Sequence, residues 1–191
     1  MTAQAKVQGR RLIAVVFLAG ALAGALLVVP LVGALLGGVP AAEAVTTYTR
    51  SASCAGLDFY PTDSDSAYTN LGSARYRPDN SGTGVFRCDP GLPTGAKVKK
   101  VQFTLDSFAT YQCLYRRSGL TAAGAESYDT IGQVSISSTG GVPTRLSTTT
   151  ITNGTIDNAN YGYWLECSLP ANNQGRLYGA DVIYSITAAN G

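Results

Sequence analysis

The sequence predicts an all-β fold, an antiparallel β-sandwich of jelly-roll-like type that is stapled by disulfides. Three observations favour this fold. Beyond residue 44, apolar and polar residues alternate in roughly eight short segments separated by turn-forming residues, as in sandwiches and jelly rolls. The same part of the chain shows no helical periodicity. It also holds all four cysteines, an even number that is typical of disulfide pairing in exported chains.

The first 44 residues differ from the rest. Their polar start ends in Arg10-Arg11, and residues 12–39 are all apolar, glycine or proline. Ala42-Glu43-Ala44 matches the small-residue pattern of a signal-peptide cleavage site, whereas the apolar stretch is also long enough to span a bilayer. We expect residues 1–44 to be a signal peptide, or else an uncleaved membrane anchor helix, with the cleavage pattern favouring a signal peptide. Residues 45–191 are then one exported domain.

Short strands joined by loops are expected at the start of that domain. Thr46–Ala52 is rich in threonine and fits a first strand. Ser73–Arg77 and Gly84–Cys88 are further short strands, with a turn at Asp79–Thr83 between them.

The strongest strand signal lies in the middle of the domain. Val101, Phe103 and Leu105 alternate with polar residues, and a second alternating run follows at Tyr111–Arg117. Because only a short link separates the two runs, we expect adjacent strands that form a hairpin.

The last third of the domain predicts further strands. Ile131–Ser137 and Arg145–Thr152 come first, and Asn153-Gly154 then marks a turn. Two longer alternating runs follow. The first run predicts a strand with one face made of Tyr161, Tyr163, Leu165, Cys167 and Leu169. The second run predicts another strand with one face made of Tyr178, Ala180, Val182, Tyr184 and Ile186.

The four cysteines allow three pairings. Cys54 and Cys88 both flank the irregular first part of the domain, whereas Cys113 and Cys167 lie within strand-like runs. We therefore expect structural disulfides Cys54–Cys88 and Cys113–Cys167.

Charge and composition narrow the function classes. Residues 45–191 contain 11 basic and 11 acidic side chains and no basic stretch, which argues against nucleic acid as a partner and leaves only the N-terminal segment for membrane contact. The chain has no histidine, so the commonest general base and histidine-ligated metals are excluded. Nothing in the spacing of the carboxylates singles out a hydrolytic pair. We therefore expect a protein that is not an enzyme.

Three segments resemble a recurring pattern of exported bacterial proteins. They are LPTGAKVKKVQFTLDSFATYQCLYRR, TTTITNGTIDNANYGYWLE and RLYGADVIY, at residues 92–117, 148–166 and 176–184. The resemblance extends over roughly residues 55–187, and the proteins that this part of the chain resembles are small secreted all-β domains without an assigned activity. It implies export and a β-sandwich, and it brings no catalytic residues with it.

One candidate metal site is an acidic loop. Asp63 and Asp65 lie one residue apart in Pro61–Ser66, and oxygen-rich loops of this kind suit weak extracellular calcium binding. The loop lacks the glycine and distal glutamate of the helix-loop-helix calcium motif, and a solvated Asp/Ser turn accounts for the same residues. No other cofactor is indicated.

The candidate ligand site is aromatic. If Tyr161 and Tyr163 face the core, Trp164 points outward, beside Gly162 and Glu166 on the same strand face. An outward tryptophan next to a carboxylate suits stacking on a sugar ring or docking of a surface protein, with the two tyrosines as further contacts. The alternative is a Trp164 that is buried under a loop or in a second layer.

These observations predict a non-catalytic extracellular binding or surface module, with carbohydrate as the ligand class. The protein would be secreted, or held at the outer face of the membrane by residues 12–39. The alternative is a structural component of the cell envelope or extracellular matrix that self-associates as a homo-oligomer, because a neutral surface rich in Thr, Ser and Tyr does little to oppose association.

Overall fold

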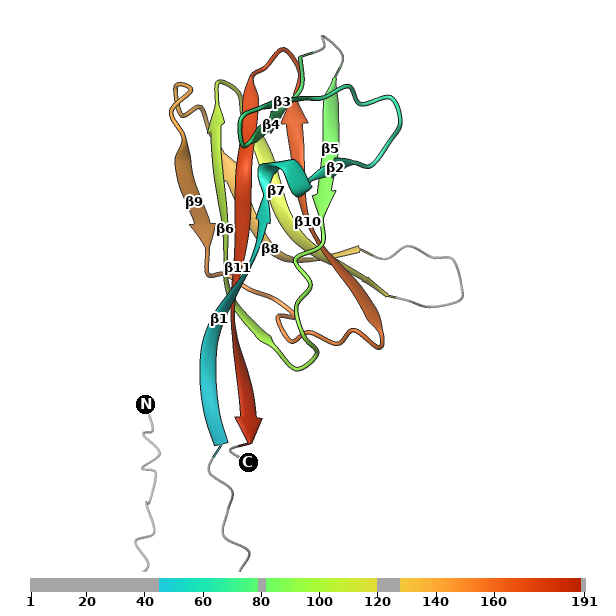
Figure 1. The fold of residues 1–191 in the computed structure, drawn as a ribbon, viewed down its shortest axis with the longest axis vertical. Coiled ribbons are helices and arrows are strands. Elements are labelled where there is room, and N and C mark those ends of the chain that lie inside the picture. Colours follow the sequence, from blue (N-terminus) through green and yellow to red (C-terminus); the bar gives the residue numbers. More distant parts are fainter. Residues whose placement is uncertain (1–44, 79–81, 120–127, 190–191) are drawn as a thin grey trace, which may run out of the picture. The chain divides into compact units, whose positions relative to one another are not determined.

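The computed structural model describes residues 45–78, 82–119 and 128–189, and these residues form two antiparallel sheets packed face to face (Figure 1). One sheet contains β3 (Thr69–Leu71), β4 (Ala74–Tyr76), β11 (Gly175–Ala189), β6 (Lys97–Ser107) and β9 (Thr144–Thr148), with β1 (Val45–Ala55) paired to β11. The other contains β2 (Tyr60–Pro61), β5 (Thr83–Cys88), β10 (Tyr161–Pro170), β7 (Tyr111–Gly119) and β8 (Tyr128–Ile136). The predicted antiparallel β-sandwich is confirmed. The predicted signal or anchor helix and part of the turn at 79–83 lie outside the described residues.

Long strands that follow one another in sequence mostly lie in different sheets. The chain passes from β6 to β7, from β8 to β9, from β9 to β10 and from β10 to β11 by crossing between the layers. Such crossings are characteristic of jelly-roll-like sandwiches.

The predicted hairpin in the middle of the domain is wrong. β6 pairs with β11 and β9, whereas β7 pairs with β10 and β8 in the opposite sheet. The alternating pattern identifies the inward face of each strand, but it carries no information on which neighbour the strand edge pairs with.

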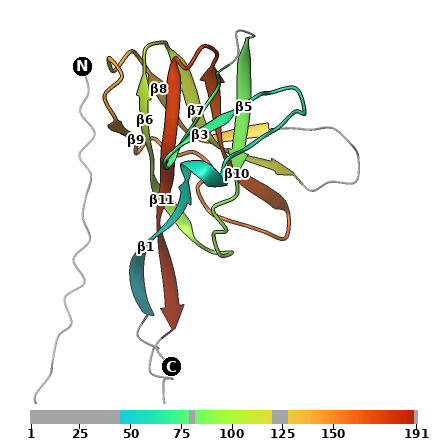
Figure 2. The ribbon, with the colours of Figure 1, turned by 45° about the horizontal axis from the view of Figure 1, so that its top comes forward.

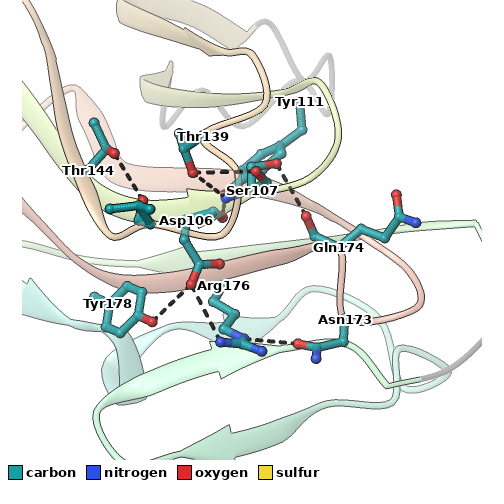
Figure 3. A network of polar contacts seen from close by, with 10 residues as sticks. Asp106, Ser107, Tyr111, Thr139, Thr144, Asn173, Gln174, Arg176 and Tyr178 are labelled. Atoms are coloured by element: carbon teal, nitrogen blue, oxygen red, sulfur yellow. Dashed lines mark hydrogen bonds and ion pairs between the residues drawn. The ribbon is translucent and has the colours of Figure 1, made fainter.

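Polar contacts hold the link at residues 108–110, where the chain passes from β6 in one sheet to β7 in the other (Figure 3). The Ser107 hydroxyl donates to the carbonyls of Ala109 and Gln174, and the Phe108 N–H donates to the same Gln174 carbonyl at 2.8 Å. The Ser107 N–H donates to the Thr139 hydroxyl at 2.8 Å. Because Gln174 and Thr139 come from two other loops that are distant in sequence, the link is fixed by tertiary contacts.

The core lies between the sheets and is built from the inward residues of the long strands. Phe103 and Leu105 of β6, Tyr115 of β7 and Leu165 of β10 are fully buried. The predicted inward face of β10 is therefore confirmed, with Tyr161 at its half-buried end.

The predicted inward face of β11 holds only from Ala180 onward. The pairing of β11 with β6 shifts between Leu177 and Gly179, so Leu177 is buried and Tyr178 points outward. The Tyr178 hydroxyl donates to Asp106 Oδ2 at 3.0 Å (Figure 3), and burial, followed by this bond, raises the pKa of Tyr178. One extra residue at a bulge reverses the alternation, and the sequence pattern does not reveal the bulge.

Both predicted disulfides are confirmed. Cys54 of β1 joins Cys88 of β5 and so links the two sheets, with the two Cα atoms 6.4 Å apart. Cys113 and Cys167 are directly opposite residues of β7 and β10, with the two Cα atoms 4.1 Å apart.

β1 and the end of β11 form a two-stranded ribbon that extends beyond the sandwich (Figure 2). Val45 pairs with Ala189, so the first and last described residues lie side by side at the end of the ribbon. In the described part of the chain, no helix is long and apolar enough to cross a membrane.

Candidate functional site

A cluster of aromatic and charged side chains lies on the outer face of the five-stranded sheet. Its members are Trp164 and Glu166 of β10, Arg87 of β5, Arg116 of β7 and Tyr128 of β8, which we call the Trp164 cluster. Trp164 is directly opposite Arg116, and Glu166 is directly opposite Arg87, so the four side chains share one sheet face. Trp164 is half-buried, as expected for an outward aromatic that packs against neighbours on the sheet.

Glu166 is buried and holds the side chains of Arg87 and Trp164 in place by hydrogen bonds. It is only 5% exposed. Its Oε2 accepts a hydrogen bond from Arg87 Nε at 2.9 Å and another from the Trp164 indole N–H at 3.1 Å. Arg116 Nε lies 3.3 Å from Glu166 Oε1, but this N–H is not directed at an acceptor, so the contact is an ion pair without a hydrogen bond. A buried carboxylate with two guanidinium partners holds the indole edge in place.

The indole ring contacts two neighbours. The Arg87 guanidinium carbon lies 4.8 Å from the centroid of the Trp164 ring, within cation–π range. Tyr128 meets Trp164 edge to face, with ring centroids 5.6 Å apart. Tyr128 is 39% exposed, so the aromatic pair is accessible to a ligand.

A second aromatic–arginine contact lies on the inward side of the same strands, where Arg117 is directly opposite Tyr163. The Arg117 guanidinium covers the Tyr161 ring at 4.2 Å and pairs with Asp129 at 2.7 Å. The hydrogen bond to Asp129 raises the pKa of Arg117, which outweighs the opposing effect of burial. This pair is electrically balanced and lies on the inward side of the strands, so it adds no net charge to the outer face.

The three predicted ligand residues do not form a single site. Tyr163 points inward, is only 8% exposed, and its hydroxyl accepts a hydrogen bond from the Asp157 N–H at 2.8 Å. Tyr161 is half-buried on the same side of the strand and lines, with Tyr163, a pocket of about 250 Å³. Asp89, Leu92 and Asn158 are among the other residues that line it. Of the three, only Trp164 belongs to the outer face.

The sequence gives no sign of Arg87 and Tyr128 as members of the site. Each lies more than 35 residues from Trp164 in the chain. Only the pairing of β5 with β10, and of β7 with both β8 and β10, brings them together. Outward polar positions next to buried residues, such as Arg87 between Phe86 and Cys88, are the one signal that could have suggested them.

The acidic loop forms a turn held by its own side chains. Asp63 Oδ1 accepts the Asp65 N–H at 3.1 Å, and Asp63 Oδ2 accepts the Ser66 hydroxyl at 3.1 Å. No group of three or more His, Cys, Asp or Glu side chains that could hold a metal ion occurs among the described residues. The loop therefore has the contacts of an Asx turn, and calcium at Asp63 and Asp65 stays a prediction.

Other outward carboxylates are also paired with arginine. Asp106 is 1% exposed and lies 3.6 Å from Arg176, and Asp181 lies 2.6 Å from Arg145. Both carboxylates lie on the outer face of the six-stranded sheet, and each serves as the ion-pair partner of an arginine.

A larger hollow lies between the edges of the two sheets. Its volume is about 310 Å³, and it is lined by β8 and by the 148–152 segment, with Thr130, Thr148, Thr150 and Thr152 among its walls. It contains neither an aromatic ring nor a charged side chain. Its polar groups are therefore limited to hydroxyls and amides, beside the apolar Ile131.

No protein-family model matches the sequence, and no curated protein sequence is significantly similar to it. Among solved structures, the chain is similar to a family 29 carbohydrate-binding module from Piromyces equi, with 13% identity and a TM-score of 0.37, over 74% of this chain and 90% of that one. It is also similar to the family 11 carbohydrate-binding module from Clostridium thermocellum in complex with a β-1,3-1,4-mixed-linked tetrasaccharide, with 13% identity and a TM-score of 0.33, over 77% of this chain and 91% of that one.

Two further similar structures are enzymes of which the chain spans about a quarter. They are the GH26-CBM35 β-(1,4)-mannanase of Podospora anserina, with 12% identity and a TM-score of 0.39, over 74% of this chain and 28% of that one. The second is the xylanase 10B of Clostridium thermocellum, with 15% identity and a TM-score of 0.39, over 73% of this chain and 26% of that one. At these values the comparisons assign neither a family nor a ligand.

Proposed function

We propose that this protein is a non-catalytic extracellular module that binds carbohydrate on the outer face of its five-stranded sheet, with Trp164 as the stacking platform. The observation that carries the proposal is the fixed, half-buried indole. Its edge is held by Glu166, the Arg87 guanidinium carbon lies 4.8 Å from its ring centroid, and Tyr128 meets it edge to face.

Such an arrangement suits a sugar ring. The C–H faces of a pyranose pack on aromatic rings, and polar groups around the ring meet its hydroxyls. Because Trp164 is already held by its neighbours, binding would cost little side-chain entropy. A sheet face without a deep cleft is open along the strands, so it suits a chain of sugars better than a single small molecule.

The extracellular assignment rests on the disulfides. Both pairs join strands within or between the sheets. Such bonds form and persist in oxidising compartments, which supports export of residues 45–191.

The test uses the fluorescence of the single tryptophan. The purified protein is titrated with a panel of soluble glycans, and emission of Trp164 is expected to shift or quench with at least one of them. Calorimetry then compares the wild type with Trp164→Ala and with Tyr48→Ala, an exposed tyrosine of β1 that serves as the control. Trp164→Ala should weaken binding about tenfold or more, or about 1.4 kcal/mol, and Tyr48→Ala should not. Unchanged affinity of Trp164→Ala would refute the proposal.

A second candidate function, self-association, is favoured by the edge of β1. β1 is 11 residues long, keeps one register throughout, and pairs with no strand other than β11 within residues 45–78, 82–119 and 128–189. Most of its residues are exposed, and it contains one arginine but no lysine or proline. Of the other outer edges, β9, β3 and β2 are at most five residues long, and β8 is nine residues long. Since proteins usually guard long open edges, β1 is suited to pair with a second copy.

The test of this candidate is the oligomeric state. Analytical ultracentrifugation should show a dimer, and the double variant Thr49→Lys/Ser51→Lys should be monomeric at the same melting temperature, because opposed lysines repel across an antiparallel pair. A wild-type protein that sediments as a monomer at every accessible concentration would eliminate this function.

A further inference from the structure

We infer that the glycan bound at the Trp164 cluster is anionic, with a carboxylate or sulfate group that the terminal nitrogens of Arg87 and Arg116 bind. The inference rests on the proposed function and names the substrate class of that same site. Four properties of the cluster support it: its charge balance, the burial of Glu166, the open guanidinium donors, and their position beside the indole.

The cluster carries one excess positive charge. Arg87 and Arg116 face a single carboxylate, Glu166. The neighbouring pair of Arg117 and Asp129 is neutral by itself. A ligand with one negative charge would therefore complete the charge balance of this face.

Glu166 is too buried to act as an acceptor for a ligand. Its Oε2 already accepts two hydrogen bonds, its Oε1 faces Arg116, and the residue is 5% exposed. A neutral sugar therefore finds no accessible carboxylate acceptor for its hydroxyls at the centre of the cluster. The groups that remain for a ligand are donors.

Those donors belong to the two guanidinium groups. In the described part of the chain, the terminal nitrogens of Arg87 and Arg116 make no hydrogen bond, since Arg87 bonds only through Nε and Arg116 only ion-pairs through Nε. The two side chains are 31% and 27% exposed. The terminal edge of a guanidinium presents two parallel N–H groups, a geometry that matches the two oxygens of a carboxylate or sulfate.

The donors lie where a substituent of a stacked sugar would reach. The Arg87 guanidinium carbon is 4.8 Å from the Trp164 ring centroid, and Arg116 is directly opposite Trp164 on the neighbouring strand. A ring stacked on Trp164 would therefore place an acidic substituent within reach of either arginine. Lysine would supply the charge without the paired donors.

The experiment measures binding by calorimetry on the full chain. Oligogalacturonate is compared with its fully methyl-esterified form, and a sulfated galactan oligosaccharide with its desulfated form, at low and at physiological salt. Each pair keeps the sugar ring and differs in the negatively charged group, which is esterified in one case and removed in the other. At least one charged form should bind tenfold or more tightly than its uncharged counterpart, and this difference should shrink with added salt, because ions screen exposed charge.

Variants then test whether the preference for the charged glycan depends on Arg87 and Arg116. Arg87→Gln should lose most of the preference for the charged form, and Arg87→Lys should keep part of it. Lys99→Gln, which removes an exposed positive charge from β6 of the other sheet, should keep all of it. Circular dichroism of each variant confirms that the fold is intact, and Arg116→Gln repeats the test from the other side of Glu166.

The outcomes separate the two proposals. Preference for the uronate, for the sulfated form or for both supports the inference and tells which anion is the source. Equal binding of charged and uncharged forms, weakened in each case by Trp164→Ala, overturns the inference and leaves the proposed function intact. Inorganic sulfate that binds as tightly as the sulfated oligosaccharide would also overturn it, because the sugar would then contribute nothing. No Trp164-dependent binding of any glycan refutes both.

Discussion

Single side chains set the properties of the outer face, and Glu166 is the most consequential of them. It is a buried carboxylate whose two oxygens hold two arginines and the indole N–H. Buried ion pairs stabilise little when intact, but removing one partner leaves the others uncompensated.

Glu166→Gln should therefore lower the free energy of unfolding by about 1–3 kcal/mol, less than for a fully buried pair because both arginines are partly exposed. The indole would also lose its fixed edge, so the emission of Trp164 should broaden and shift to the red. Urea unfolding followed by tryptophan fluorescence reports both effects. An unchanged midpoint and spectrum would show that Glu166 does not organise the cluster.

Two stacked tyrosines of the core give a matched comparison. The rings of Tyr115 and Tyr163 lie 6.3 Å apart, but only Tyr163 uses its hydroxyl, as acceptor from the Asp157 N–H. The Tyr115 hydroxyl is buried and has no hydrogen-bond partner among the described residues.

Tyr115→Phe should leave the free energy of unfolding within about 1 kcal/mol of the wild type or raise it, because it removes an unsatisfied buried group. Tyr163→Phe should cost about 1–2 kcal/mol, because the Asp157 N–H loses its partner. Urea unfolding of the two variants measures the difference. Equal costs would mean that the Tyr115 hydroxyl has a partner after all.

At the scale of the element, strand faces are predictable and strand partners are not. The alternation at Val101–Leu105 and in Tyr161–Leu169 correctly identifies the inward faces of β6 and β10. The same alternation favours a β6–β7 hairpin, which is wrong, because edge pairing depends on contacts of Ser107 and Gln174 with distant loops. Since the site is assembled across partners, Trp164 could be predicted and Arg87 could not.

The disulfide between the sheets is the element-scale feature with the clearest energetic consequence. Cys54–Cys88 closes 34 residues and connects β1 to β5. Restricting a loop of that length in the unfolded chain stabilises the fold by about 3–4 kcal/mol.

Cys54→Ala/Cys88→Ala should lower the free energy of unfolding by about that amount. The loss should be accompanied by faster hydrogen exchange of the β1 amides, because β1 otherwise pairs only with β11. Urea unfolding and native-state hydrogen exchange test the two parts. A change of less than about 1 kcal/mol would show that the bond restricts little in the unfolded chain.

At the scale of the whole molecule, stability should depend on alkaline pH. Burial raises the pKa of Tyr111 and of Tyr115, and nearby charge adds to it, from Asp106 for Tyr111 and from Tyr163 and Asp89 for Tyr115. Burial likewise raises the pKa of Tyr178. Above about pH 10, these tyrosines ionise in the unfolded chain while they stay protonated in the folded protein.

The unfolded state then binds fewer protons, so stability is fully present below about pH 10 and falls as pH rises further. The melting temperature should be flat from about pH 8 to about pH 9.5 and decline above it, and the decline should be shallower in Tyr115→Phe. A melting temperature that is independent of pH up to about pH 11 would contradict the burial of these hydroxyls.

The central claim is that a glycan binds on the outer face of the five-stranded sheet. Solution NMR of the isotope-labelled protein, titrated with the glycan that gives the strongest fluorescence response, tests it most directly. The indole N–H of Trp164 and the Nε–H signals of Arg87 and Arg116 should shift first, together with backbone amides of β5, β7 and β10. Shifts centred instead on the edge of β1, or on the pocket of Tyr161 and Asn158, would contradict the account.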